Sequence, residues 1–283
     1  MKTVKISIFT VLAIATLGMM SCKKGCTDEK ATNYYDKAKR DDGTCTYTSS
    51  LEIQIDHSIN GEVITWNEKN YTNAAGNLYS IETLKYYVSD VVLHGASGTS
   101  DYSTELVHYR DALDEGTREF MIMDIPVGSY EKISFTFGLD EVDNIAGGLE
   151  NTSINGNMEW PAAMGGGYHY MKLEGKYADA SSSTGEASYN IHTGASGGTP
   201  YHFTVTLDSD DINMVVETGS SFEAHLMMNI NNWFTGNNTF DFTTYGAAIM
   251  GNASAQADIK ANGEAGLFML HHFAEEEAGH HDH

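Results

Sequence analysis

Residues 51–56 read Leu51-Glu52-Ile53-Gln54-Ile55-Asp56, with apolar and polar side chains alternating at every position. This is the period of a β-strand that has one buried face. Similar strand signals follow downstream, separated by clusters of Gly, Asn, Asp and Ser, at residues 84–93, 105–109, 120–125, 132–139, 168–177, 187–192, 202–207, 221–229 and 255–259. The pattern predicts an all-β domain over residues 51–270, an antiparallel β-sandwich or partly open barrel of about nine or ten strands.

The charge balance argues against binding to nucleic acid. The chain has 39 acidic and 16 basic side chains, for a formal net charge of -23. Such a surface repels phosphate backbones and attracts cations, so we expect no nucleic-acid partner. The sequence has no His-Glu-x-x-His pattern and no phosphate loop. We therefore expect a binding protein rather than an enzyme, without catalytic residues.

The beginning of the chain has the features of an export signal. Lys2 and Lys5 precede an apolar run over residues 6–20, which is short for a membrane span and typical of a signal peptide. Ser21-Cys22 after that run resembles a bacterial lipoprotein box, although Met19 stands where Leu is usual. We expect a signal peptide at residues 1–21, a lipid on Cys22 that anchors the protein to a membrane, and a location in the bacterial cell envelope, on the periplasmic side of the outer membrane or the cell surface. The alternative is an ordinary signal peptide that happens to contain a cysteine.

Two further cysteines, Cys26 and Cys45, follow Cys22. Export places them in an oxidising compartment, so we expect them to form a disulfide rather than remain free thiols. The stretch between them resembles a small cysteine-bracketed module common near the ends of secreted Bacteroidota proteins. We interpret residues 22–50 as the lipidated N-terminus, this spacer module and a linker. Residues 271–283, rich in His and acidic side chains, are expected to form a disordered tail.

Four stretches of the main domain resemble the MbnP-like family of bacterial periplasmic and lipoprotein domains, which includes copper-binding relatives from methane-oxidising bacteria. They occur in the family's order at residues 71–93, 158–175, 191–194 and 228–234. The resemblance implies an all-β domain, copper binding and a di-haem cytochrome c peroxidase-like partner. In the copper-binding relatives, a tryptophan near the second stretch can be oxidised to kynurenine and join histidines at the metal, and Trp160 falls there. The chain departs from that pattern in the four residues after Trp160, Pro161-Ala162-Ala163-Met164.

Histidine and methionine side chains supply the candidate copper ligands, because imidazole and thioether donors suit this metal. His169 and Met171 share a face if the strand is regular, and Met164 precedes them across a three-glycine turn. His192 ends a neighbouring strand, and His225 repeats the His-x-Met spacing with Met227. The predicted metal residues are His169, His192, Met164, Met171, His225 and Trp160.

Each of these residues also has an ordinary structural role open to it. Methionine on a strand usually packs in a core, and Trp160 can be a packing aromatic. The alternative function is a non-metal binding module of the cell envelope, such as a surface protein or an accessory to a glycan receptor. If His169 and His192 share a metal, their side chains should come within about 4–5 Å of each other. The tail histidines, His280, His281 and His283, with His271 and His272, form a second candidate site of low affinity.

Overall fold

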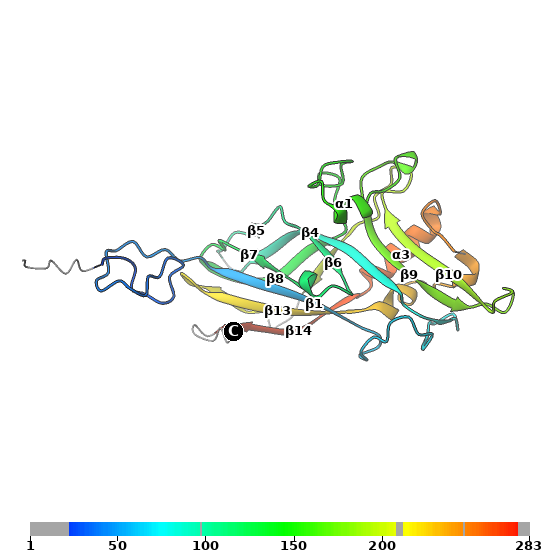
Figure 1. The fold of residues 1–283 in the computed structure, drawn as a ribbon, viewed down its shortest axis with the longest axis horizontal. Coiled ribbons are helices and arrows are strands. Elements are labelled where there is room, and N and C mark those ends of the chain that lie inside the picture. Colours follow the sequence, from blue (N-terminus) through cyan, green and yellow to red (C-terminus); the bar gives the residue numbers. More distant parts are fainter. Residues whose placement is uncertain (1–22, 97, 208–211, 246, 277–283) are drawn as a thin grey trace, which may run out of the picture. The chain divides into compact units, whose positions relative to one another are not determined.

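The computed structural model describes residues 23–96, 98–207, 212–245 and 247–276. The chain divides into two compact units, Met1–Tyr47 and Thr48–His283, which are coloured along the sequence in Figure 1. The expected signal peptide, Cys22 and the last three histidines, His280, His281 and His283, lie outside the described residues. Within the described ranges, no helix has both the length and the apolar character needed to cross a membrane.

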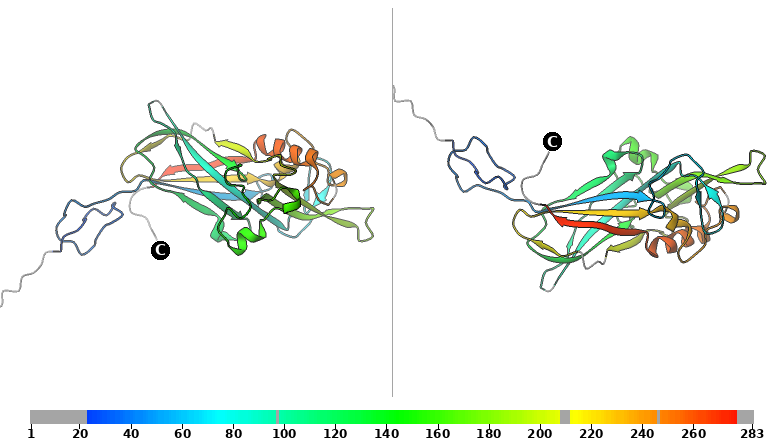
Figure 2. Two further views of the ribbon diagram at one scale, coloured as in Figure 1. Left: turned by 90° about the horizontal axis from the view of Figure 1, so that it is seen from above. Right: turned by 90° about the horizontal axis from the view of Figure 1, so that it is seen from below.

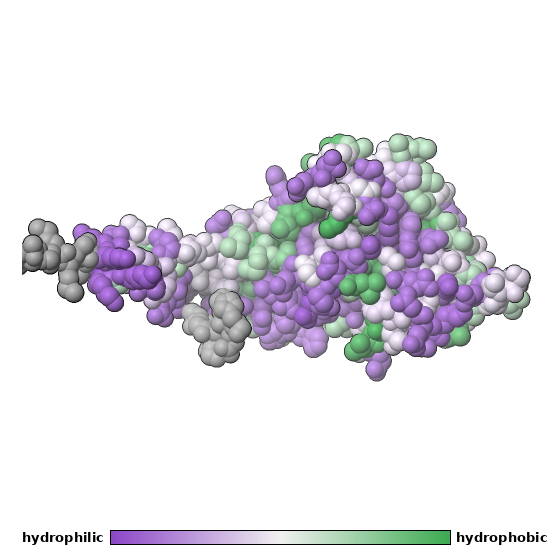
Figure 3. All heavy atoms as spheres, viewed as in Figure 1, coloured by the Kyte–Doolittle hydropathy of each residue, from purple (hydrophilic) through white to green (hydrophobic). Residues whose placement is uncertain are grey.

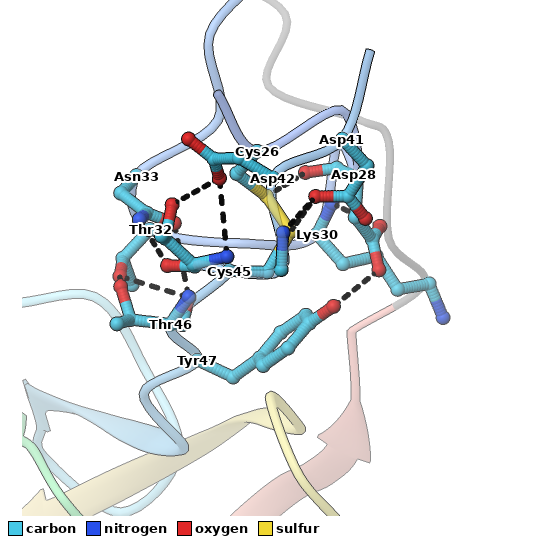
Figure 4. The surroundings of a disulfide bond; sticks show 12 residues. Cys26, Asp28, Lys30, Thr32, Asn33, Asp41, Asp42, Cys45, Thr46 and Tyr47 are labelled. Carbon is cyan, nitrogen blue, oxygen red and sulfur yellow. Dashed lines mark hydrogen bonds between the residues drawn. A yellow bond between two sulfur atoms is a disulfide. The ribbon is translucent and has the colours of Figure 1, made fainter. Parts of the chain in front are cut away.

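A disulfide between Cys26 and Cys45 closes the first unit, as predicted for two cysteines of an exported chain. Figure 4 shows the polar contacts around it. The Asn33 amide donates to the Thr44 carbonyl and accepts from the backbone N–H of Thr46, and the Tyr47 hydroxyl donates to Asp28. Because the buried apolar side chains here are as small as Cys26 and Ala31, the disulfide and these hydrogen bonds order the unit.

The second unit contains two β-sheets, shown from three sides in Figures 1 and 2. The smaller has the strand order β14-β13-β1-β7, with bounds β1 (Ser50–Ser58), β7 (Glu119–Ile122), β13 (Ser221–Asn229) and β14 (Phe268–Glu275). The larger has the main order β11-β8-β4-β9-β3-β2. Its long strands are β4 (Thr83–Gly95), β8 (Gly128–Phe137), β9 (His169–Ala178) and β10 (Glu186–Gly194), with β10 paired to β9. Its shorter strands are β2 (Tyr71–Thr72), β3 (Leu78–Tyr79), β5 (Tyr102–Ser103), β6 (Val107–Asp111), β11 (Phe203–Leu207) and β12 (Met214–Val216). The predicted all-β class is confirmed.

Most strand pairs are antiparallel, but β1 and β13 run parallel, with Leu51 opposite Phe222. The stretch that opens the domain forms β1, and its alternation has the expected result: Leu51, Ile53 and Ile55 are each 0% exposed. They belong to one large core that also contains Trp233 and many other aromatic rings. On the face shown in Figure 3, hydrophobic residues lie in separate small groups among hydrophilic ones.

The helices are short and lie in the connections between strands. They are η1 (Glu115–Thr117), α1 (Ser153–Asn157), η2 (Ala162–Met164), η3 (Ile230–Phe234), α2 (Phe242–Tyr245) and α3 (Ala253–Glu264). The strand predicted at residues 255–259 is wrong, because this segment belongs to α3. Asn252 caps the helix by accepting from the N–H of Ala255, and the buried Ala255 and Ile259 are four residues apart on one helical face.

The end of the domain also differs from the prediction. The sequence placed the domain boundary at residue 270 and a disordered tail from residue 271. Instead, β14 pairs with β13 from Phe268 to Glu275, and the N–H of Glu276 still donates to the Ser221 carbonyl. Histidines expected in the tail, His271 and His272, are therefore strand residues.

His57 on β1 leads to a prediction about pH. Its Nε2 lies 2.9 Å from the Tyr86 hydroxyl, and burial followed by the charge of Arg110 lowers the pKa of His57 to about 3. An unfolded histidine has a pKa of about 6.5, so the unfolded chain binds this proton first as the pH falls. Stability from neutral His57 is therefore complete above about pH 6.5 and is lost toward about pH 3, with a slope of up to about 1.4 kcal/mol per pH unit.

We expect His57→Gln to flatten the pH dependence of the unfolding free energy between about pH 6.5 and pH 4. Urea denaturation at several pH values measures this slope. The matched control is His271→Gln on the exposed surface of β14, which removes an imidazole without touching the surroundings of His57. Equal slopes in the parent and the His57 variant would contradict the predicted burial of a neutral imidazole.

Candidate metal centre

A tight loop leads into β9 and positions the candidate residues. The N–H of Trp160 donates to the Gly167 carbonyl at 2.8 Å, and the N–H of His169 donates to the Met158 carbonyl at 2.7 Å. These bonds clamp residues 158–160 against residues 167–169. Gly167 adopts a φ of 84°, and a Cβ there would lie 2.3 Å from the Asn144 side-chain oxygen. The glycine-rich turn therefore needs glycine both for its backbone conformation and for space.

Trp160 forms one wall of the site. It is 3% exposed, and its ring lies edge-on to that of His169 with the centroids 4.8 Å apart. Its Nε1–H donates to the Met164 carbonyl at 3.3 Å. A Cβ on Gly194 would lie 2.6 Å from the indole, so the absence of a side chain on β10 lets Trp160 pack there.

His169 has a nitrogen that is free to act as a ligand. Its Nδ1 lies 3.0 Å from the Met158 carbonyl. A carbonyl only accepts, so Nδ1 carries the proton and Nε2 keeps its lone pair. That Nε2 is buried and has no hydrogen-bond partner among the described residues. Burial lowers the pKa of His169 to about 4, which keeps the ring neutral and its lone pair available at neutral pH.

His192 lies beside His169 on β10. The two ring centroids are 5.0 Å apart and the planes are nearly perpendicular, at 86°. The His192 Nε2 lies 2.6 Å from Oε1 of Glu174, and this hydrogen bond is the main reason why the pKa of the Glu174 carboxyl is lowered. A neutral His192 that donates through Nε2 keeps its lone pair on Nδ1. Carboxylate–histidine pairs of this kind orient metal-binding imidazoles.

A register shift brings His169 to the face of the sheet that carries His192. Thr193 lies opposite Met171 and Gly194 lies opposite His169, which leaves Tyr170 as an extra residue in β9. The bulge interrupts the alternation that would place His169 and Met171 on the same face. Met171 is instead 0% exposed in the main core, so the structure separates it from the two histidines.

The remaining predicted ligands have other surroundings. Met164 joins the site through its backbone, because its carbonyl accepts from Trp160 and from the N–H of Gly197, whereas its terminal methyl lies near Gly251. His225 is on β13 in the smaller sheet, opposite His272. The structure therefore brings together His169, His192 and Trp160 and leaves His225 elsewhere.

The sequence analysis missed two residues that shape the site. Glu174 orients His192 through a hydrogen bond. The sequence pattern that could have pointed to it is Lys172-x-Glu174, because this spacing places both side chains on one face of a regular strand. Lys172 lies opposite His192, its ammonium binds the Asn157 carbonyl, and burial lowers its pKa. Its positive charge opposes a second cation near His169.

Three carboxylates gather at a separate place. Asp90, Asp140 and Asp143 each offer one oxygen, and these atoms lie within 4.8 Å of one another. Burial, and then the charges of Asp90 and Asp140, raise the pKa of Asp143. All three residues are partly buried, and the cluster contains neither His169 nor His192.

Comparisons with known proteins locate the chain in a family. A search of the curated proteins gave no match. Among solved structures, MbnP from Methylosinus trichosporium is similar, with 13% sequence identity, a TM-score of 0.43, and coverage of 69% of this chain and 80% of that chain. The family model described as MbnP matches residues 48–251, which is more than half of the chain. The chain therefore belongs to the MbnP family.

Proposed function

We propose that this protein is an exported, lipid-anchored MbnP-family protein that binds copper through His169 and His192, for capture or delivery of the metal. The observation that carries the proposal is the buried Nε2 of His169, a lone pair without a partner among the described residues, directed away from the Met158 carbonyl that holds Nδ1. The choice of copper as the metal rests on the copper-binding relatives that the sequence resemblance implies.

The spacing of the two imidazoles suits a shared ion. Metal–nitrogen bonds of about 2 Å with tetrahedral angles set two ring centroids about 5 Å apart. The rings of His169 and His192 have centroids 5.0 Å apart. Glu174 fixes the orientation of His192 by a hydrogen bond to Nε2, which leaves Nδ1 for the metal. Copper is the cargo here, and these two nitrogens supply the donors.

The donor set favours the monovalent state of copper, because Cu⁺ accepts low coordination numbers and imidazole donors. The local charges are of both signs, since Lys172 contributes a positive charge near His169 and the Glu174 carboxylate lies 2.6 Å from His192 Nε2. Trp160 acts as packing in this proposal, because its N–H is bonded to the Met164 carbonyl and its ring fills the space over Gly194. The di-haem cytochrome c peroxidase-like partner rests on the resemblance.

Imidazole nitrogen spectra test the metal site directly. One equivalent of Cu⁺ should shift the ¹⁵N resonances of His169 Nε2 and His192 Nδ1, because metal binding replaces a free lone pair at each. The matched control is His202, whose Nε2 lies 3.3 Å from Glu141 and which is also a histidine paired with glutamate. Its resonances should stay in place. Equal shifts at His202, or no shift at His169, would contradict the proposal.

The lipid anchor has its own test. We expect Cys22→Ser to release the protein from the membrane fraction, because without the thiol no acyl chains attach and each buried methylene contributes about 0.8 kcal/mol. Cell fractionation with an antibody against the β domain measures the distribution. Ser21→Ala, which keeps a small residue before the cysteine, is the control and should remain membrane-bound. A Cys22→Ser protein that stays in the membrane fraction would refute the anchor and leave the copper proposal intact.

A further inference from the structure

The outer face of the smaller sheet carries a second group of metal-binding side chains. Figure 2 shows β1, β13 and β14 side by side in the right-hand view. On β13, the buried Phe222, Ala224 and Leu226 alternate with the partly exposed Glu223, His225 and Met227. Since alternate strand residues share a face, Glu223 and His225 lie on the outer face together.

A bulge in β14 turns a histidine onto the same face. Leu270 and Phe273 both pack against the core, with the exposed His271 and His272 between them. The register shifts between His225 and Leu226, so that His225 pairs with His272 and Leu226 pairs with Leu270. Without the extra residue, the alternation that starts at Leu270 would point His272 into the core.

The two imidazoles converge on one carboxylate. Their ring centroids are 5.5 Å apart. Glu223 Oε1 lies 3.2 Å from His272 Nε2, and its Oε2 lies 3.6 Å from His225 Nε2. Ligand atoms of a tetrahedral ion with bonds of about 2 Å are about 3.3 Å apart, so each imidazole lies near one carboxylate oxygen at about that spacing, and a side-chain rotation must bring the three donors together.

The Nε2 atom of His225 is available to bind an ion. Its surface is buried, and it has no hydrogen-bond partner among the described residues, since the distance to Glu223 is longer than a hydrogen bond. The His272 side chain is 50% exposed, so it can rotate toward His225 when an ion binds. The surrounding charge is favourable to a cation, because Glu52 lies opposite Glu223 on β1.

From this geometry we infer that Glu223, His225 and His272 form a site for a divalent transition-metal ion of the Zn²⁺ or Cu²⁺ class. Two imidazole nitrogens and one carboxylate oxygen are the donors that these ions prefer, and the solvent side leaves a fourth position for water or another ligand. This site is distinct from the His169–His192 pair, which lies on β9 and β10 of the larger sheet. It does not depend on the proposed copper site.

The test uses the full chain with His280, His281 and His283 replaced by Ser, so that the tail cannot chelate the probe. Zn²⁺ binding by titration calorimetry should decrease at least about tenfold in affinity in His225→Gln, in His272→Gln and in Glu223→Gln. The matched control is His271→Gln, an exposed neighbour on the same strand, which should bind within about twofold of the parent. A Cu²⁺ arm, read by electron paramagnetic resonance, should show nitrogen coupling that His272→Gln reduces.

These substitutions are at partly exposed positions, and unfolding curves check that each variant remains folded. Imidazole spectra add an independent measurement, since Zn²⁺ should shift His225 and His272 but not His271. The inference is overturned if the parent binds no Zn²⁺, or if His271→Gln weakens binding as much as His272→Gln does. His169→Ala with His192→Ala should leave this Zn²⁺ site unchanged, so the two sites can fail separately.

Discussion

Replacing both His169 and His192 with alanine is expected to lower the affinity for Cu⁺ by about a hundredfold or more. Loss of groups that merely orient a ligand costs about 10- to 100-fold in metal affinity, and this change removes the ligands themselves. Competition with a chromophoric Cu⁺ chelator measures the affinity. The measurement needs protein in which His280, His281 and His283 are replaced, since these residues carry imidazoles of their own.

A single substitution tests the same ligands with less risk of unfolding the protein. His169 is 5% exposed, so its removal leaves a small cavity, whereas the His192 side chain is 17% exposed and tolerates truncation better. We expect His192→Ala alone to keep the fold and still lower the Cu⁺ affinity. His202→Ala is the control, since it also removes a histidine paired with a glutamate. Undiminished Cu⁺ binding by folded His192→Ala would show that this residue is not a ligand.

Trp160→Ala is expected to give the largest loss of stability around the site, about 3–5 kcal/mol. The indole is 3% exposed, packs over Gly194 and lies edge-on to His169. Its removal leaves a cavity and breaks the hydrogen bond from Nε1 to the Met164 carbonyl. Urea denaturation measures the change in unfolding free energy, and the pKa of His169 should rise from about 4 toward its ordinary value as water enters.

Trp160→Phe separates the ring from its polar group. Phenylalanine keeps an aromatic edge toward His169 and loses the Nε1 hydrogen bond, so its cost should be smaller, near the 1–2 kcal/mol typical of a buried hydrogen bond and a reduced contact. If Trp160→Ala cost less than about 1 kcal/mol, the indole would not be a packed wall of the site.

The strands with regular alternation could be predicted from the sequence. The alternation of Leu51, Ile53 and Ile55 with polar residues predicts β1 correctly, because each of the three side chains is buried in the core. Ala255, Ala257 and Ile259 also fit a period of two, so the pattern predicts a strand where the chain forms the helix at residues 253–264. Its N-cap at Asn252 was the signal that distinguishes the helix from a strand.

Both histidine pairs depend on bulges, which a local pattern does not reveal. An extra residue at Tyr170 in β9 separates His169 from Met171, and the shift in β14 turns His272 toward His225. A bulge is fixed by the partner strand, so its position comes from pairing over a long distance rather than from neighbouring residues. The sequence therefore identified His169, His192 and His225 as chemically capable and paired His169 with His192, but it could not separate Met171 from His169 or bring His272 to His225.

The parallel pairing of β1 with β13 has the same origin. It joins residues 50–58 to residues 221–229, which are far apart in the chain, and no turn between them sets the register. β14 then adds to the other side of β13, and this is why residues 271–275 belong to the sheet.

The most direct test is the Cu⁺ affinity and stoichiometry of the otherwise unchanged β domain, measured in protein that lacks the tail histidines. The chain should end after Glu276, because earlier truncation would remove residues of β14 and its last backbone contact. We predict one Cu⁺ bound with a dissociation constant well below about 1 μM, held by His169 and His192. A dissociation constant weaker than about 1 μM would contradict the copper proposal and favour a binding module of the cell envelope that does not use a metal.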